Sequence, residues 1–108
     1  MYIHVDLRTQ PGSIQIRETE DFRSFKVIVC GQGDREDLSA ALAPLGFLTA
    51  DDAYLKIAAV RALAGEIARD PQWSASFEAM VEYADAHGWV KGNHLQAHCE
   101  FVNESSER

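Results

Sequence analysis

Four short segments of this sequence alternate apolar and polar residues, and their placement constrains the fold more than any other feature. Three of them, at 2–8, 13–18 and 24–30, come before a long helical stretch, and the fourth, at 94–102, follows it. Such alternation is typical of a strand with one buried face. Because the strands are grouped apart from the helices, the pattern predicts an α+β domain.

Helix signals fill the stretch between the third and fourth strands. A first helix is expected after Asp34, a favourable N-cap, and a second after Thr49, whose spacing to Asp52 resembles a capping box. The second helix is expected to run to residue 68. The third, over 70–87, starts with an Asp-Pro pair and repeats apolar residues every three or four positions, as an amphipathic helix does.

The predicted architecture is a single α+β domain over residues 1–102, in the order β-β-β-α-α-α-β. We expect a mostly antiparallel sheet of about four strands, covered on one face by three helices. A short extra strand at 89–91 is an alternative. Residues 103–108 are polar and are expected to form a frayed tail. A chain of 108 residues leaves no room for a second core.

The balance of charge argues against two classes of partner. The chain carries 10 Lys and Arg against 17 Asp and Glu, a net charge of -7. Nucleic acids and anionic membranes are bound mainly through basic residues, so neither is an expected partner. The acidic middle of the chain has two interpretations: a solvated helical surface, or a surface that engages a basic protein as a decoy or inhibitor.

Cysteine usage and the absence of apolar targeting segments predict a cytoplasmic protein. No apolar run approaches the ~18–20 residues that a membrane span needs, and the N-terminus lacks the basic region of a signal peptide. Cys30 and Cys99 match neither a disulfide framework nor a zinc motif, and both are expected to be reduced. Cys99 is in phase with core residues, whereas Cys30 lies near a helix start and is the better nucleophile candidate.

The polar face of the sheet is the first candidate site. His4 and Asp6 are two residues apart on a strand, so their side chains point the same way about 6.6 Å apart, and His98 with Glu100 repeats this arrangement. If the two strands are neighbours, the four side chains would form one patch able to bind Zn²⁺ or to act as acid and base. The alternative is an ordinary solvated sheet face.

Two further features have simpler structural interpretations. The run Gly31-Gln32-Gly33 follows a strand and precedes a helix, as in dinucleotide-binding turns, but it lacks the third glycine and is followed by acidic residues that would repel phosphate. Trp73 and Trp89 flank the third helix and could line an apolar pocket, although such residues more often belong to the core.

No motif in the sequence fixes a reaction or a cofactor. We therefore expect a non-catalytic interaction or ligand-binding module that acts as a homodimer, because Ile28 and Cys30 would leave an apolar spot on the open sheet face for a second copy. The alternative function is a small enzyme, a hydrolase or isomerase, with or without a metal ion, that uses His4, Asp6, His98 and Glu100.

Overall fold

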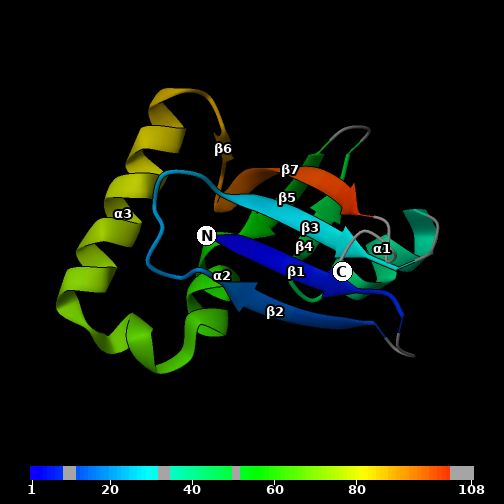
Figure 1. The fold of residues 1–108 in the computed structure, drawn as a ribbon. Coiled ribbons are helices and arrows are strands. Elements are labelled where there is room, and N and C mark those ends of the chain that lie inside the picture. The colour runs from blue at the N-terminus through cyan, green and yellow to red at the C-terminus, as the bar shows by residue number, and fades with distance from the viewer. Residues whose placement is uncertain (9–11, 32–34, 50–51, 103–108) are drawn as a thin grey trace.

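The computed structural model describes residues 1–8, 12–31, 35–49 and 52–102, and within them seven strands and three α-helices form one α+β unit (Figure 1). The strands are β1 (Tyr2–Asp6), β2 (Ser13–Arg17), β3 (Lys26–Cys30), β4 (Gly46–Leu48), β5 (Asp52–Lys56), β6 (Val90–Lys91) and β7 (His94–Val102). The helices are α1 (Arg35–Leu42), α2 (Ile57–Ala64) and α3 (Pro71–Ala86), with a 3₁₀ segment (Gly65–Arg69) before α3.

The sheet is mixed, and it has more strands than the sequence predicts. Its spatial order is β2-β1-β3-β7-β5-β4, with β6 paired to the first residues of β7. The α+β class and the strands β1, β2, β3 and β7 are confirmed. The mostly antiparallel four-strand sheet is not, because β1 pairs with β3, and β3 with β7, in parallel.

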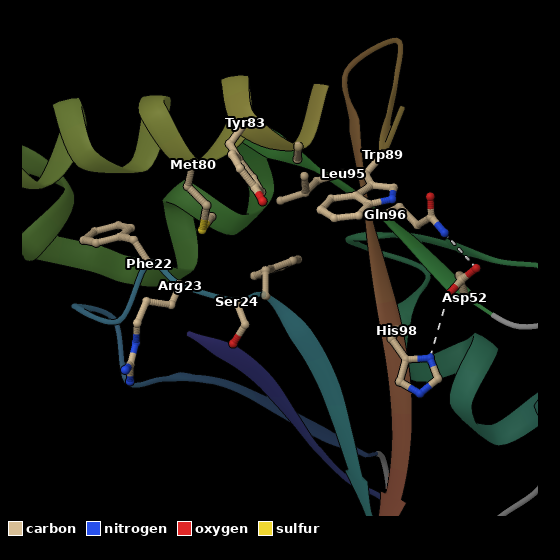
Figure 2. Close-up of a pocket in the computed structure, with 12 residues that line it drawn as sticks. Phe22, Arg23, Ser24, Asp52, Met80, Tyr83, Trp89, Leu95, Gln96 and His98 are labelled. Atoms are coloured by element: carbon tan, nitrogen blue, oxygen red, sulfur yellow. Dashed lines mark hydrogen bonds and ion pairs between the residues drawn. The ribbon is translucent and has the colours of Figure 1, made fainter. Parts of the chain in front are cut away.

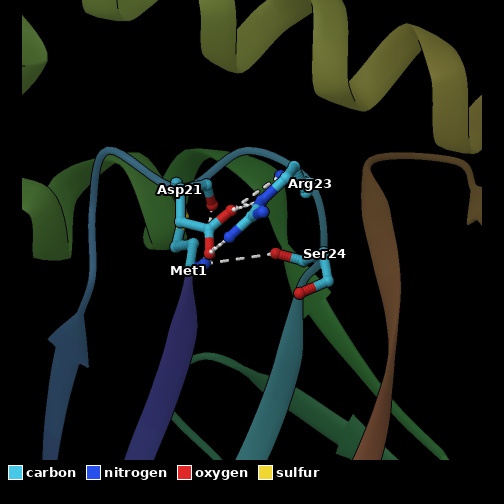
Figure 3. Close-up of polar contacts among 4 residues, drawn as sticks. All are labelled: Met1, Asp21, Arg23 and Ser24. Atoms are coloured by element: carbon cyan, nitrogen blue, oxygen red, sulfur yellow. Dashed lines mark hydrogen bonds and ion pairs between the residues drawn. The ribbon is translucent and has the colours of Figure 1, made fainter.

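The parallel pairing of β1 and β3 follows from the path of the chain between β2 and β3. After β2 the chain crosses over the start of β1, and β3 then runs along the opposite edge of β1 (Figure 1). The crossing segment is held by the Met1 ammonium, which donates to the carbonyl oxygens of Asp21 at 2.6 Å and Ser24 at 3.3 Å (Figure 3). Burial lowers the pKa of this ammonium group.

The second predicted helix begins later than expected. Strands β4 and β5 form an antiparallel pair in this part of the chain, and α2 starts only at Ile57. The contact between Thr49 and Asp52 exists, since the amide of Asp52 donates to Thr49 Oγ1 at 3.2 Å, but it closes a turn between two strands. Ala53, Tyr54 and Leu55 are all buried, so tertiary packing on both sheet faces overrides the helical signal.

The alternating residues of the N-terminal strands supply the sheet's side of the core. Ile3, Val5 and Val27 are fully buried, and Val29 is 1 % exposed. Side chains from all three helices join the same cluster: Leu38 and Leu42 from α1, Val60 from α2, and Trp73 and Phe77 from α3.

The helices are distributed around the sheet (Figure 1). Helix α3 crosses the end of the sheet where β1 and β3 begin, and α1 lies near the opposite end. Phe101 is in phase with the buried Leu95 and Ala97 of β7 but is 61 % exposed, because β5 pairs with β7 only as far as His98. Within the described residues, no helix combines the length and the apolar character needed to cross a membrane. The predicted tail, 103–108, lies outside those residues.

Candidate functional site

The four residues predicted for the polar patch share one sheet face, but β3 separates them into two pairs. His4 lies opposite Ile28 of β3, and Ile28 lies opposite Glu100 of β7. Two strand spacings, about 9.6 Å, therefore separate β1 from β7. The pair on β1 and the pair on β7 do not form the single cluster that neighbouring strands would give.

Both carboxylates of the predicted patch, Asp6 and Glu100, already have basic partners. Asp6 Oδ1 lies 3.0 Å from Arg8 Nε, and hydrogen bonds from Arg8 lower the pKa of Asp6 from 3.8 to about 2. Glu100 Oε1 lies 3.4 Å from Lys26 Nζ. In the part of the chain that the structure describes, no three His, Cys, Asp or Glu side chains are grouped so that they could hold a metal ion.

His98 instead lies beside Asp52, a residue that the sequence pattern assigned to a helix cap. The two are directly opposed in the antiparallel β5–β7 pair, and His98 Nδ1 is 4.0 Å from Asp52 Oδ1. Gln96, two residues before His98 and on the same face, donates from Nε2 to Asp52 Oδ2 at 2.8 Å. An imidazole, a carboxylate and an amide thus converge on one side of β7.

This polar group forms one end of a half-open pocket of about 400 Å³ (Figure 2). The other end is formed by Phe22, Arg23 and Ser24, and α3 supplies Met80 and Tyr83 above it. The apolar lining is Phe22, Phe25, Met80, Tyr83, Ala84, Trp89 and Leu95; the polar lining is Arg23, Ser24, Asp52, Gln96 and His98.

A gap in the pairing of β7 creates the space. One edge of β7 is paired with β5 throughout residues 94–98. The other edge is paired first with β6. Next, the backbone N–H of Gln96 donates to the Trp89 carbonyl oxygen at 2.8 Å. Pairing with β3 begins only at His98. The pocket occupies the notch between Trp89 and the start of β3, and α3 covers it.

Aromatic rings line the mouth of the pocket. Trp89 is 43 % exposed, and its ring centroid is 6.2 Å from that of Tyr83 and 4.9 Å from that of His87. Gly88, at φ +81°, takes the left-handed conformation that follows the end of α3 and turns the chain toward Trp89. Trp73, by contrast, is 4 % exposed and belongs to the core.

The charge of Arg23 is balanced locally. Its Nε lies 3.0 Å from Asp21 Oδ1, which together with further Arg23 hydrogen bonds lowers the pKa of Asp21 (Figure 3). Asp52 has no such basic neighbour among the interactions that the structure records for it, apart from the His98 ring. At the polar end of the pocket, the carboxylate of Asp52 therefore faces the pocket interior.

The cysteines do not offer an activated nucleophile. Burial raises the pKa of the Cys99 thiol, and the charge of Asp52 raises it further, so the reactive thiolate is disfavoured. Cys30 is fully buried. Of the Gly31-Gln32-Gly33 run, only Gly31 lies within the described residues.

Sequence reasoning found part of this pocket. It named His98, and it named Trp89 as a possible pocket residue. It missed Asp52 because the Thr-x-x-Asp spacing is shared by helix caps and turns, and it missed Tyr83 because that residue lies off the main apolar stripe of α3. Gln96 is in phase with His98 along β7, which was the one local signal for it.

Comparison of the chain with protein-family models, with curated proteins and with solved structures finds no match.

Proposed function

We propose that the protein is a binding module for a small organic molecule with an apolar body and one polar end. The observation that carries this proposal is the pocket in the notch of β7, where aromatic and aliphatic side chains lie beside Asp52, which is hydrogen-bonded to Gln96 and faces His98. Ligand sites usually combine mostly apolar walls with a few placed polar groups.

The size of the pocket supports this assignment. About 400 Å³ is within the range of small-molecule sites and is large enough for a one- or two-ring compound. Two rings at the mouth, Tyr83 at 61 % exposure and Trp89 at 43 %, are left open to solvent. Large exposed aromatic side chains next to a cavity offer area that a ligand can cover.

Two-dimensional NMR with 1-naphthalenemethanol, a neutral two-ring compound, tests the proposal. We expect amide shift changes concentrated at the residues that line the pocket. Trp89→Ala should weaken binding about tenfold, because it removes a ring from the mouth of the pocket.

The matched control is Phe47→Ala. Phe47 is 47 % exposed, similar to the 43 % of Trp89, but it stacks on Tyr54, and neither of these two residues lines the pocket. This variant should bind as the wild type does. Shift changes scattered over the surface, or equal losses in both variants, would refute the pocket as the binding site.

A second candidate function, acid–base catalysis, is favoured by the Asp52–His98 pair. The carboxylate 4.0 Å from Nδ1 favours a proton on that nitrogen and leaves Nε2 to accept one from water. A water activated in this way would attack an ester carbonyl within the pocket. Of the residues predicted for an enzyme, His98 is the one that lies in this pocket.

Hydrolysis of 1-naphthyl acetate tests this second candidate. The wild type should exceed the His98→Gln variant by at least about a hundredfold, the usual contribution of a positioned base. Equal rates in the two proteins, with binding of the naphthyl compound retained, would refute the catalytic function and leave ligand binding as the only proposed function.

A further inference from the structure

The chemistry at the polar end of the pocket indicates what kind of polar group its ligand carries. Asp52 Oδ2 accepts from Gln96, whereas the partner recorded for Oδ1 is His98 Nδ1 at 4.0 Å, beyond hydrogen-bonding distance. The Asp52 side chain is 24 % exposed, so it is partly withdrawn from water but still reachable from the pocket. A carboxylate oxygen in this position favours a donor, and most strongly a charged one.

The aromatic walls favour the same charge. A cation held within about 6 Å of an aromatic centroid is attracted by the negative face of the ring. Trp89 and Tyr83 have their centroids 6.2 Å apart at 61°, so their rings form two sides of a corner. The same protein already places a cation against a ring elsewhere, with Lys91 Nζ 5.3 Å from the Tyr54 centroid.

The basic residues near the pocket do not oppose a cation strongly. Lys26 lies opposite His98 in the β3–β7 pair, and its Nζ is 3.4 Å from Glu100 Oε1. Arg23 lies at the opposite end of the pocket from Asp52 (Figure 2), and its guanidinium is paired with Asp21. An anionic ligand would instead approach Asp52 unfavourably, in a protein whose net charge is -7.

We propose that the ligand is an organic ammonium: a protonated amine or quaternary ammonium group that lies between Asp52 and Trp89, with an apolar body extending toward Met80 and Phe22. This inference rests on the proposed binding function and names the ligand class of that same pocket. Neutral and anionic molecules of the same shape then bind more weakly, because they lose both the carboxylate contact and the cation–ring attraction.

Three compounds that share a naphthyl body test the inference: the amine 1-naphthylmethylamine, the alcohol 1-naphthalenemethanol and the carboxylate anion of 1-naphthaleneacetic acid. Their dissociation constants for the full chain are compared by NMR titration at neutral pH. The amine should bind at least about fivefold more tightly than the alcohol, and the acid should bind most weakly. If none of the three binds, the binding function itself fails; if the alcohol or acid binds as tightly as the amine, only the ammonium assignment fails.

Two isosteric variants locate the effect. Asp52→Asn keeps the shape of the side chain and should remove the preference of the protein for the amine over the alcohol. The control is Glu36→Gln, which changes the net charge by the same amount at an exposed position of α1, outside the pocket lining. It should retain the preference. A preference that persists in Asp52→Asn, or that falls equally in both variants, would overturn the proposal.

Discussion

The carboxylate of Asp52 and the imidazole of His98 face each other across the β5–β7 pair, with 4.0 Å between Oδ1 and Nδ1. The two residues lie 46 positions apart in the sequence. The pairing of β5 with β7 therefore creates this arrangement. The amide of Gln96, at 2.8 Å from Asp52 Oδ2, fixes the orientation of the carboxylate.

Removing this amide should weaken the binding of an ammonium ligand without affecting a neutral one. In Gln96→Leu, the Asp52 side chain loses a hydrogen bond worth about 1 kcal/mol and becomes free to turn toward solvent. We expect the affinity for 1-naphthylmethylamine to fall about fivefold. The affinity for 1-naphthalenemethanol, measured in the same titrations, should stay constant; parallel losses for both compounds would contradict a positioning role for Gln96.

The two tryptophans should respond very differently to replacement by phenylalanine. Trp73 donates from Nε1 to the Thr19 carbonyl oxygen at 2.7 Å and stacks on Phe77 with 5.0 Å between ring centroids. Trp73→Phe leaves that carbonyl without its donor and opens a small cavity, so the free energy of unfolding should fall by about 1–3 kcal/mol. Trp89→Phe, at an exposed position, should change it by less than about 0.5 kcal/mol.

Urea denaturation of the wild type and both variants, followed by circular dichroism, measures these differences. Equal destabilisation of the two variants would mean that Trp73 has no special role in joining α3 to the segment before β3.

Local sequence signals were sufficient for the elements that are built from local rules. The alternation of β1, β2, β3 and β7, and the Asp70 N-cap with Pro71 at the start of α3, each follow from side-chain periodicity and capping within a few residues. The side chain of Asp70 indeed accepts from the amide of Gln72 at 2.9 Å. These features need no knowledge of the rest of the chain.

The pairing of the strands, by contrast, depends on long-range packing. The sequences of β1 and β3 do not indicate that these strands pair in parallel. Their parallel pairing follows from the path of the 18–25 segment, which crosses over Met1. The β5 run of three buried residues has no alternation, because Tyr54 is covered by Phe47 and Lys91 on the face opposite the core. Such coverage on both faces removes the period that identifies a strand.

The site shows the same division. The alternation of β7 was enough to identify His98 as a polar-face residue, but its carboxylate partner depends on which strand lies beside β7. Sequence reasoning left open whether the strand of His98 lies next to β1, whereas β3 and β5 are its neighbours. The pocket as a whole combines residues from the segment before β3, from β5, from α3, from the segment before β6, and from β7. No local pattern links these five segments.

Gly46 should be intolerant of any side chain because of the β4–β5 pairing. A Cβ atom added there would lie 1.8 Å from the Tyr54 carbonyl oxygen, which is backbone and cannot move aside cheaply. Gly46→Ala should therefore lower the free energy of unfolding by at least about 2 kcal/mol. It should also weaken naphthyl ligand binding, since β5 carries Asp52.

The control for Gly46 is Gly92, whose added Cβ would have no atom within 4 Å but whose φ is +61°. Gly92→Asn should cost less than about 1 kcal/mol, because asparagine tolerates this left-handed conformation. Thermal and urea denaturation of both variants make the comparison. A Gly46→Ala protein as stable as Gly92→Asn would contradict the close approach of the two strands.

Asp6 should contribute a small, pH-dependent share of the stability. Hydrogen bonds from Arg8 lower its pKa from 3.8 to about 2 in the folded chain, so protons bind the unfolded state more readily. The stabilisation is therefore present above pH 4 and is lost as the pH falls from 4 toward 2. Because both side chains are at the surface, water screens the pair and we expect less than about 1 kcal/mol.

Asp6→Asn isolates this contribution. The difference in the free energy of unfolding between wild type and variant should be measurable at pH 7 and should shrink by pH 2. Glu78→Gln, which breaks a looser pair with Arg61 at 3.5 Å, serves as the control and should show a smaller change. A constant difference between wild type and Asp6→Asn across this pH range would refute the assigned ion pair.

The homodimer expected from the sequence remains a prediction, and the structure narrows the surface that would form it. Cys30 is fully buried within one chain, so it cannot contribute the apolar contact assigned to it. Ile28 remains, half-buried on the sheet face opposite the core residues Val27 and Val29, between His4 of β1 and Glu100 of β7. Two copies that meet across this face would bury Ile28 against its equivalent by two-fold symmetry.

Ile28→Lys tests this surface, because a charge at a two-fold contact would face the same charge on the other copy. We expect sedimentation velocity to show a dimer for the wild type and a monomer for the variant, with the pocket's ligand affinity unchanged in both. Phe101→Lys is the control: Phe101 is exposed, but its neighbour in β3 is the core residue Val29, which places it on the other face. A monomeric wild type, or a dimer that Phe101→Lys disrupts instead, would show that the open sheet face does not join two copies.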